Sequence, residues 1–129
     1  MGVGRRLISI VWQAIDPGAE VYRACRLTSE RDKKAGTPKA KLFFRRADET
    51  GLSVGLTSRR AVRDIRPEGL FKMIARDIRS CEEPLHFAQD EPEHAEIQGM
   101  PIYQQDETTA LRIANHLMRH ARICPIPAA

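Results

Sequence analysis

The chain has 129 residues, of which 42% are hydrophobic and 29% charged, which is enough for one globular domain and excludes a disordered chain. No apolar run is long enough to cross a bilayer, so a membrane-spanning protein is excluded as well. The formal net charge is +4 and rests on 16 arginines and 5 lysines, a ratio that suits phosphate-bearing partners and equally fits a GC-rich genome. We expect a single α/β domain over residues 1–129, alone or as a homo-oligomer.

The first predicted elements are an N-terminal segment and one strand. Residues 1–15 are interpreted as an N-terminal arm or an edge strand, because an apolar, β-branched run ends there at a turn signal. Residues 21–27 alternate between apolar and polar positions, which predicts a half-buried strand. Arg23 stands in the apolar row of this strand with Val21 and Cys25, so the pattern directs an arginine toward the core side.

The middle of the chain predicts a loop, a hairpin and a short helix. Residues 28–40 are polar and contain glycine and proline, which indicates a long, mobile loop. Two strands over 41–46 and 52–56 are predicted to pair as a hairpin across the tight turn between them. A short helix is expected over 57–65, capped by its first or second residue.

The C-terminal half predicts two short strands and one long helix. Residues 70–80 fit both helical spacing and strand alternation, and residues 85–88 and 94–97 are predicted to form strands on either side of an acidic turn. The last helix is expected to begin at an Asp106 cap. Its apolar stripe is predicted to consist of Leu111, Ala114, Leu117, Met118 and Ala121. The sequence therefore predicts an α+β fold, with a small mixed or antiparallel sheet of five or six strands and the C-terminal helix packed on one face.

Cofactor and metal motifs are missing from the sequence. There is no Walker A or G-x-G-x-x-G loop, and the three cysteines are far apart without a C-x-x-C pair. His116 and His120 have the spacing of a helical metal site, but Arg112 and Arg119 on the same face oppose a cation. We therefore predict no metal and no cofactor, and the cysteine pattern favours a reducing, cytoplasmic location.

Three residues from different predicted strands are candidates for catalysis: Arg23, Ser53 and His94. An arginine on the core side of a strand is unusual, and with a second arginine it would suit a phosphate or phosphodiester. A histidine can transfer a proton near neutral pH. The alternative is that His94 lies in a loop or at a strand edge and has no catalytic task.

Further arginines are candidates for ligand binding. Arg45 and Arg46 project to opposite faces at a strand end, so only one points inward, where Asp48 or an anion would be its partner. The predicted helix over 57–65 carries three more arginines on or near one side. The candidate binding residues are Tyr22, Arg45, Arg46, Asp48, Arg59, Arg60 and Arg63.

Three segments resemble a group of small uncharacterised bacterial proteins. They are V-Y-R-A at 21–24, F-F-R-R-A-D-E-T-G-L-S-V at 43–54 and H-A-E-I-Q-G-M-P at 94–101. The resemblance covers most of the chain and implies no activity. It implies a strand over 72–78, which favours the strand alternative there.

A fainter resemblance is to ADP-ribosyltransferase-like folds, including RES-type toxins that degrade NAD. It rests on an arginine that follows an aromatic residue in the first core strand, as in Tyr22 and Arg23, and on a serine in a second strand, as in Ser53. The catalytic glutamate of these folds has no clear counterpart, and Glu96 is the position that we consider for it.

Two functions are predicted as alternatives. The first is a binding or regulatory module whose arginine-rich face takes an anionic partner, either nucleic acid or an acidic protein. Residues 1–64 hold 14 basic and 7 acidic side chains whereas residues 65–129 hold 7 and 10, so this partner is expected on the N-terminal half. The second is a toxin-like enzyme directed at NAD or RNA. It requires several side chains around one concavity, namely Arg23, Arg45 or Arg46, Ser53 and His94.

Overall fold

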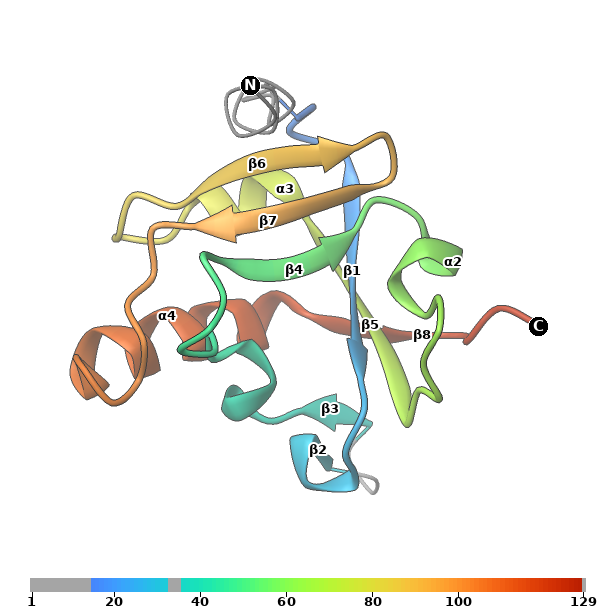
Figure 1. Ribbon diagram of the computed structural model, residues 1–129, viewed down its shortest axis with the longest axis horizontal. Coiled ribbons are helices and arrows are strands. Elements are labelled where there is room, and N and C mark those ends of the chain that lie inside the picture. Colours follow the sequence, from blue (N-terminus) through green and yellow to red (C-terminus); the bar gives the residue numbers. More distant parts are fainter. Residues whose placement is uncertain (1–14, 33–35, 129) are drawn as a thin grey trace, which may run out of the picture.

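The computed structural model describes residues 15–32 and 36–128, so the arm or edge strand predicted over 1–15 lies outside the described residues except for Ile15. The fold is α+β, as predicted: six antiparallel strands form one sheet, and helix α4 (Glu107–His120) packs on it (Figure 1). The strand order is β6-β7-β4-β1-β5-β8, with β1 (Glu20–Cys25), β4 (Leu52–Gly55), β5 (Gly69–Ile74), β6 (His86–Glu91), β7 (His94–Gln98) and β8 (Arg122–Cys124). The other elements are the ribbon of β2 (Arg31–Asp32) and β3 (Thr37–Pro38), the helices α2 (Ser58–Ala61) and α3 (Ala75–Arg79), and the 3-10 turns η1 (Thr28–Glu30) and η2 (Ala40–Phe43).

The sheet consists of two halves that diverge from one another. In Figure 1, β4, β6 and β7 run across the view, whereas β1 runs from top to bottom and β5 slants downward beside it. Strand β1 pairs with β5 along its whole length, but its registered pairing with β4 is limited to Tyr22 opposite Gly55. The remainder of β4 pairs with β7 on its other side, so β1 and β4 separate away from that crossing.

The hydrophobic core contains the apolar face of α4. The helix begins at the predicted cap, because the Asp106 carboxylate accepts a hydrogen bond from the backbone N–H of Thr109 at 3.1 Å. The predicted stripe is shifted, since Leu111 is 41% exposed whereas Ile113 is fully buried. The buried side chains of the helix are Ala110, Ile113, Ala114 and Leu117, and they share the core with Val21, Val54, Phe71, Met73 and Ile97 from the sheet and Leu42 and Phe43 from η2.

The predicted hairpin of 41–46 with 52–56 is wrong. The first segment begins with the 3-10 turn η2, and β4 pairs with β7 and β1 instead. The turn buries the adjacent side chains of Leu42 and Phe43 together, whereas a strand places neighbouring side chains on opposite faces. The turn η2 is therefore favoured over a strand, because Leu42 and Phe43 are consecutive and both face the same core.

The ambiguous segment 70–80 is divided between two elements. The strand expected over 72–78 is correct as far as Ile74, where β5 ends, and wrong beyond it, where α3 begins. The helix buries Ala75 and Ile78, which stand three residues apart and therefore share one helical face.

Three other predicted segments lie where the sequence predicts them, but their structure or their first and last residues differ from the prediction. The loop predicted over 28–40 contains η1 and the β2-β3 ribbon. Thr57 caps the predicted helix, because its hydroxyl accepts from the backbone N–H of Arg60 at 3.1 Å, but the helix ends at Ala61. The strands predicted on either side of the acidic turn are confirmed as the antiparallel pair β6-β7. Among the described helices, none has the length and apolar character that a membrane span needs.

Candidate functional site

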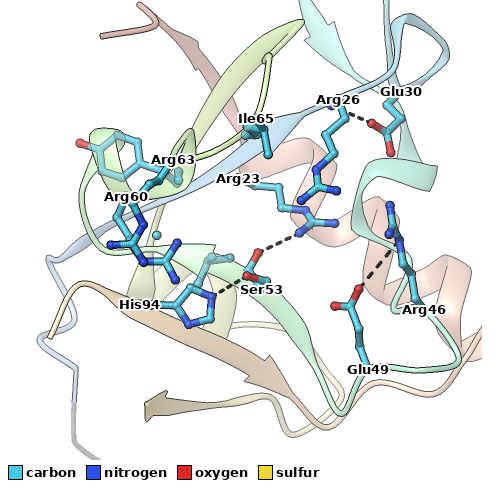
Figure 2. A pocket seen from close by; sticks show the side chains of 15 residues that line it. Arg23, Arg26, Glu30, Arg46, Glu49, Ser53, Arg60, Arg63, Ile65 and His94 are labelled. Carbon is cyan, nitrogen blue, oxygen red and sulfur yellow. Dashed lines mark hydrogen bonds and ion pairs between the residues drawn. The ribbon is translucent and has the colours of Figure 1, made fainter. Parts of the chain in front are cut away.

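A pocket of about 130 Å³ lies where β1 and β4 separate (Figure 2). Its walls come from both halves of the sheet, from α2 and from the segments around η1 and after η2. Five arginines and two glutamates line it, namely Arg23, Arg26, Arg46, Arg60, Arg63, Glu30 and Glu49. The pocket therefore carries an excess of positive charge, which attracts anions.

Arg23 bridges the two walls of the pocket. Its Nε donates to the carbonyl oxygen of Leu42 in η2 at 3.2 Å, and its Nη1 donates to the carbonyl oxygen of Ser53 in β4 at 2.9 Å. Both acceptors are neutral, and no carboxylate of the described residues forms an ion pair with this guanidinium. Figure 2 shows its other nitrogen directed into the pocket.

The charge of Arg23 is held at an energetic cost. Burial lowers the pKa of its guanidinium well below its usual range, to about 10, so the side chain remains protonated at neutral pH. The charges of Glu49 and Glu30 favour the protonated form, but neither carboxylate forms an ion pair with this guanidinium, so an anion in the pocket would supply a direct partner.

Ser53, His94 and Asp90 form a chain of short hydrogen bonds. The hydroxyl oxygen of Ser53 lies 2.6 Å from His94 Nε2, and His94 Nδ1 lies 2.6 Å from Asp90 Oδ1. The His94 side chain is only 12% exposed, whereas that of Asp90 is 41% exposed. The chain thus runs from the pocket, through a shielded imidazole, to a carboxylate at the surface.

Strand register explains how Ser53 and His94 meet. In the β4-β7 ladder His94 stands opposite Gly55, and Ser53 lies two residues from Gly55 on the same face. Gly55 has no side chain, so the imidazole is free to extend diagonally toward Ser53, and a diagonal neighbour is within reach of an aromatic ring.

A β-bulge places Asp90. In the β6-β7 ladder Gln89 pairs with Ala95 and Glu91 pairs with His94, so Asp90 is an extra residue on β6. Bulges change the direction of the side chain that they carry. Here the displaced side chain is the one that reaches the His94 ring.

Gly55 also allows α2 to approach the pocket. A Cβ atom at this position would lie 2.6 Å from the backbone nitrogen of Ala61 and 2.8 Å from the carbonyl oxygen of Thr57. The close approach brings Arg60 to the pocket wall. At the rim Glu91 forms ion pairs with Arg60 at 3.4 Å and with Arg63 at 3.6 Å.

The structure brings most of the predicted site residues into this one pocket. Those that line it are Tyr22, Arg23, Arg46, Ser53, Arg60, Arg63 and His94. The remaining three lie elsewhere. Arg45 donates to the carbonyl oxygens of Met100, at 3.0 Å, and Glu49; Asp48 is exposed; and Arg59 donates to the carbonyl oxygen of Ala128 at 3.1 Å.

Four residues of the site escaped the sequence reasoning: Arg26, Glu30, Glu49 and Asp90. Arg26 follows β1, Glu30 ends η1 and Glu49 lies in the turn before β4, segments that the sequence does not place near one another. The Glu30 carboxylate accepts from the backbone N–H groups of Arg26 and Leu27, both at 3.0 Å. Asp90 stands four residues before His94 across the hairpin end, but this spacing alone does not direct its side chain to the His94 ring.

Glu96 is opposite Ser53 in the β4-β7 ladder but is not among the residues that line the pocket. Its Oε1 accepts from the Thr50 hydroxyl at 2.8 Å and from the Gln98 amide at 3.0 Å. The carboxylate that completes the hydrogen-bond chain at the pocket is thus that of Asp90.

The paired histidines of α4 lie away from the pocket. His116 Nε2 lies 2.6 Å from the carbonyl oxygen of Asp77, and His120 Nδ1 lies 3.9 Å from the Asp77 carboxylate. The described residues contain no group of three or more histidine, cysteine or acidic side chains with the geometry to hold a metal.

In comparisons with known proteins, no family model, curated protein or solved structure matches the chain.

Proposed function

We propose that the protein binds a phosphate-bearing ligand in the arginine-lined pocket. The observation that carries this proposal is Arg23, a partly buried guanidinium with neutral hydrogen-bond partners and no ion-paired carboxylate among the described residues. Four further arginines line the same pocket. Guanidinium groups bind phosphate oxygens in a bidentate way, and hydrogen bonds between charged groups are the strongest that proteins form.

The shape of the site favours a phosphate group over a flat acidic protein surface. A concavity of about 130 Å³ has room for roughly four water volumes, which suffices for a phosphate and the atoms attached to it. The phosphate can belong to a nucleic acid or to a small molecule. In either case the partly buried Arg23 and Arg60, whose side chain is only 18% exposed, supply contacts that are less screened by salt than those of an exposed patch.

An enzyme directed at NAD or RNA is the second candidate. It is favoured by the grouping of Arg23, Ser53 and His94 around one concavity, which a module with a flat binding face does not need. Both NAD and RNA contain phosphate groups, so this candidate uses the same arginines.

Binding of pyrophosphate, followed by isothermal titration calorimetry, tests the proposal. We expect saturable binding to one site, and a loss of affinity of about tenfold or more in Arg60→Gln, because a hydrogen bond to a charged group contributes about 1.5–3 kcal/mol. The matched control is Arg59→Gln, which removes the neighbouring arginine of α2 from outside the pocket. Equal losses in both variants, or no binding by the unaltered protein, would contradict the proposal.

A further inference from the structure

The protonation pattern of the Ser53–His94–Asp90 chain follows from its connectivity. An ionised carboxylate only accepts hydrogen bonds, so the His94 Nδ1 that lies 2.6 Å from Asp90 carries a proton and donates it. In a neutral imidazole Nε2 is then the acceptor, and the Ser53 hydroxyl donates to it at 2.6 Å. This is the order of groups that activates a serine: hydroxyl, base and orienting carboxylate.

A second serine–histidine contact in the protein has the opposite pattern. His116 Nε2 lies 2.6 Å from the carbonyl oxygen of Asp77, which can only accept, so this nitrogen is a donor. It therefore cannot take a proton from Ser80, whose hydroxyl lies 3.3 Å away and donates to the same carbonyl oxygen at 2.7 Å. Ser80 also lies outside the arginine-lined pocket. Both serines therefore lie near a histidine, but only Ser53 has a histidine nitrogen that is free to accept its proton.

The surroundings of Ser53 identify the electrophile. Its hydroxyl lies in the pocket that Arg23 and Arg60 line, and Arg23 donates to the carbonyl oxygen of Ser53 itself. Arginines that hold the oxygens of a phosphate also stabilise the charge that develops on them during attack at phosphorus. The pocket thus combines an activated hydroxyl with groups suited to a phosphoryl centre.

We propose that Ser53 is a nucleophile toward the phosphorus of a bound phosphate ester or anhydride, with His94 as general base and Asp90 as the residue that positions His94. This inference rests on the proposed phosphate-binding function, because the arginines bring the phosphorus to Ser53.

The reaction proceeds in two balanced steps. In the first, the Ser53 oxygen bonds to phosphorus, His94 Nε2 takes the hydroxyl proton, and the bond from phosphorus to the leaving oxygen breaks as that oxygen receives the proton from His94. In the second, water attacks the phosphoserine, His94 takes a proton from the water, and the bond between Ser53 and phosphorus breaks as Ser53 recovers the proton. The net change is hydrolysis of one phosphoester or anhydride bond by one water.

A fluorophosphonate ester tests the nucleophile directly, because the serine displaces its fluoride and leaves a stable adduct that intact-mass spectrometry and peptide mapping detect. We expect a single adduct on Ser53, protection by pyrophosphate, and slow release of nitrophenol from p-nitrophenyl phosphate. Ser53→Ala should abolish the adduct, and His94→Gln and Asp90→Asn should slow its formation by about 10²-fold or more. Ser80→Ala is the matched control and should react like the unaltered protein.

Pyrophosphate affinity of the same variants separates the two proposals. Asp90 is exposed and outside the pocket lining, so Asp90→Asn should bind pyrophosphate normally while it reacts slowly, a split that a merely structural role would not produce. Pyrophosphate binding without an adduct on Ser53, or an adduct that forms equally fast in His94→Gln, would overturn the nucleophile and leave the proposed function intact. An adduct without pyrophosphate binding would overturn the phosphate ligand instead.

Discussion

Gly55 is the residue on which the geometry of the pocket depends most. In Gly55→Ala the new Cβ would lie 2.6 Å from the Ala61 nitrogen and 2.8 Å from the Thr57 carbonyl oxygen. Both are backbone atoms, so no side-chain rotation relieves the overlap and α2 must move away from β4. Overpacking of this kind costs about 1–3 kcal/mol. With an unfolding entropy of about 0.27 kcal/mol/K for a chain of this length, Tm should fall by about 4–11 °C.

Calorimetric unfolding with and without pyrophosphate checks this prediction. Because α2 carries Arg60, we expect Gly55→Ala to weaken pyrophosphate binding as well as to lower Tm. The control is Gly18→Ala, whose Cβ would meet its nearest atoms at an ordinary 3.4 Å, and which should leave stability unchanged or raise it by up to about 1 kcal/mol. A Gly55→Ala protein with unaltered Tm and unaltered affinity would refute the packing argument.

Three further measurements address the pocket charge and the last helix. Sulfate, whose own charge is constant in this range, should bind more weakly as the pH rises through about 10, because Arg23 then loses its proton; affinity independent of pH up to 11 would contradict this assignment. Ile113→Ala should lower the free energy of unfolding in urea by about 2–5 kcal/mol, and Leu111→Ala should lower it by much less. Equal effects of the two substitutions would indicate that Leu111 is buried, as the sequence pattern predicts. The backbone N–H of Thr109 lowers the pKa of Asp106, so this carboxylate stabilises the fold above its unfolded pKa of about 3.8. The Tm difference between the unaltered protein and Asp106→Ala should therefore shrink as the pH falls below that value, and a difference that persists at pH 2 would count against the cap.

The parts of the fold that the sequence predicts are those governed by local patterns. The cap at Asp106, the helix that follows it and the β6-β7 pair all depend on residues close together in the chain. The hairpin predicted for 41–46 fails because local alternation does not reveal that Leu42 and Phe43 both face the core. The partners of β4 are not local either, since β7 begins about forty residues later in the chain.

The candidate site divides in the same way. Arg23 is predictable, because an arginine in an apolar row is visible in the sequence, and so is its grouping with other basic residues. Asp90 is not predictable, because its direction depends on a bulge that only the paired strands define. The separation of Arg45 from Arg46 is likewise a matter of tertiary structure: Arg45 is held by the carbonyl oxygens of Met100 and Glu49, which leaves Arg46 for the pocket.

The most direct test of the proposed phosphate site is a crystal structure with tungstate, a tetrahedral phosphate analogue whose anomalous scattering locates it without ambiguity. We predict one strong peak between β1 and β4, with tungstate oxygens within hydrogen-bond distance of the Arg23 and Arg60 guanidinium groups and the tungsten close to the Ser53 hydroxyl. A peak on another face of the molecule, such as that of Arg112 and Arg119 on α4, with the pocket free of tungstate at saturating concentration, would contradict it.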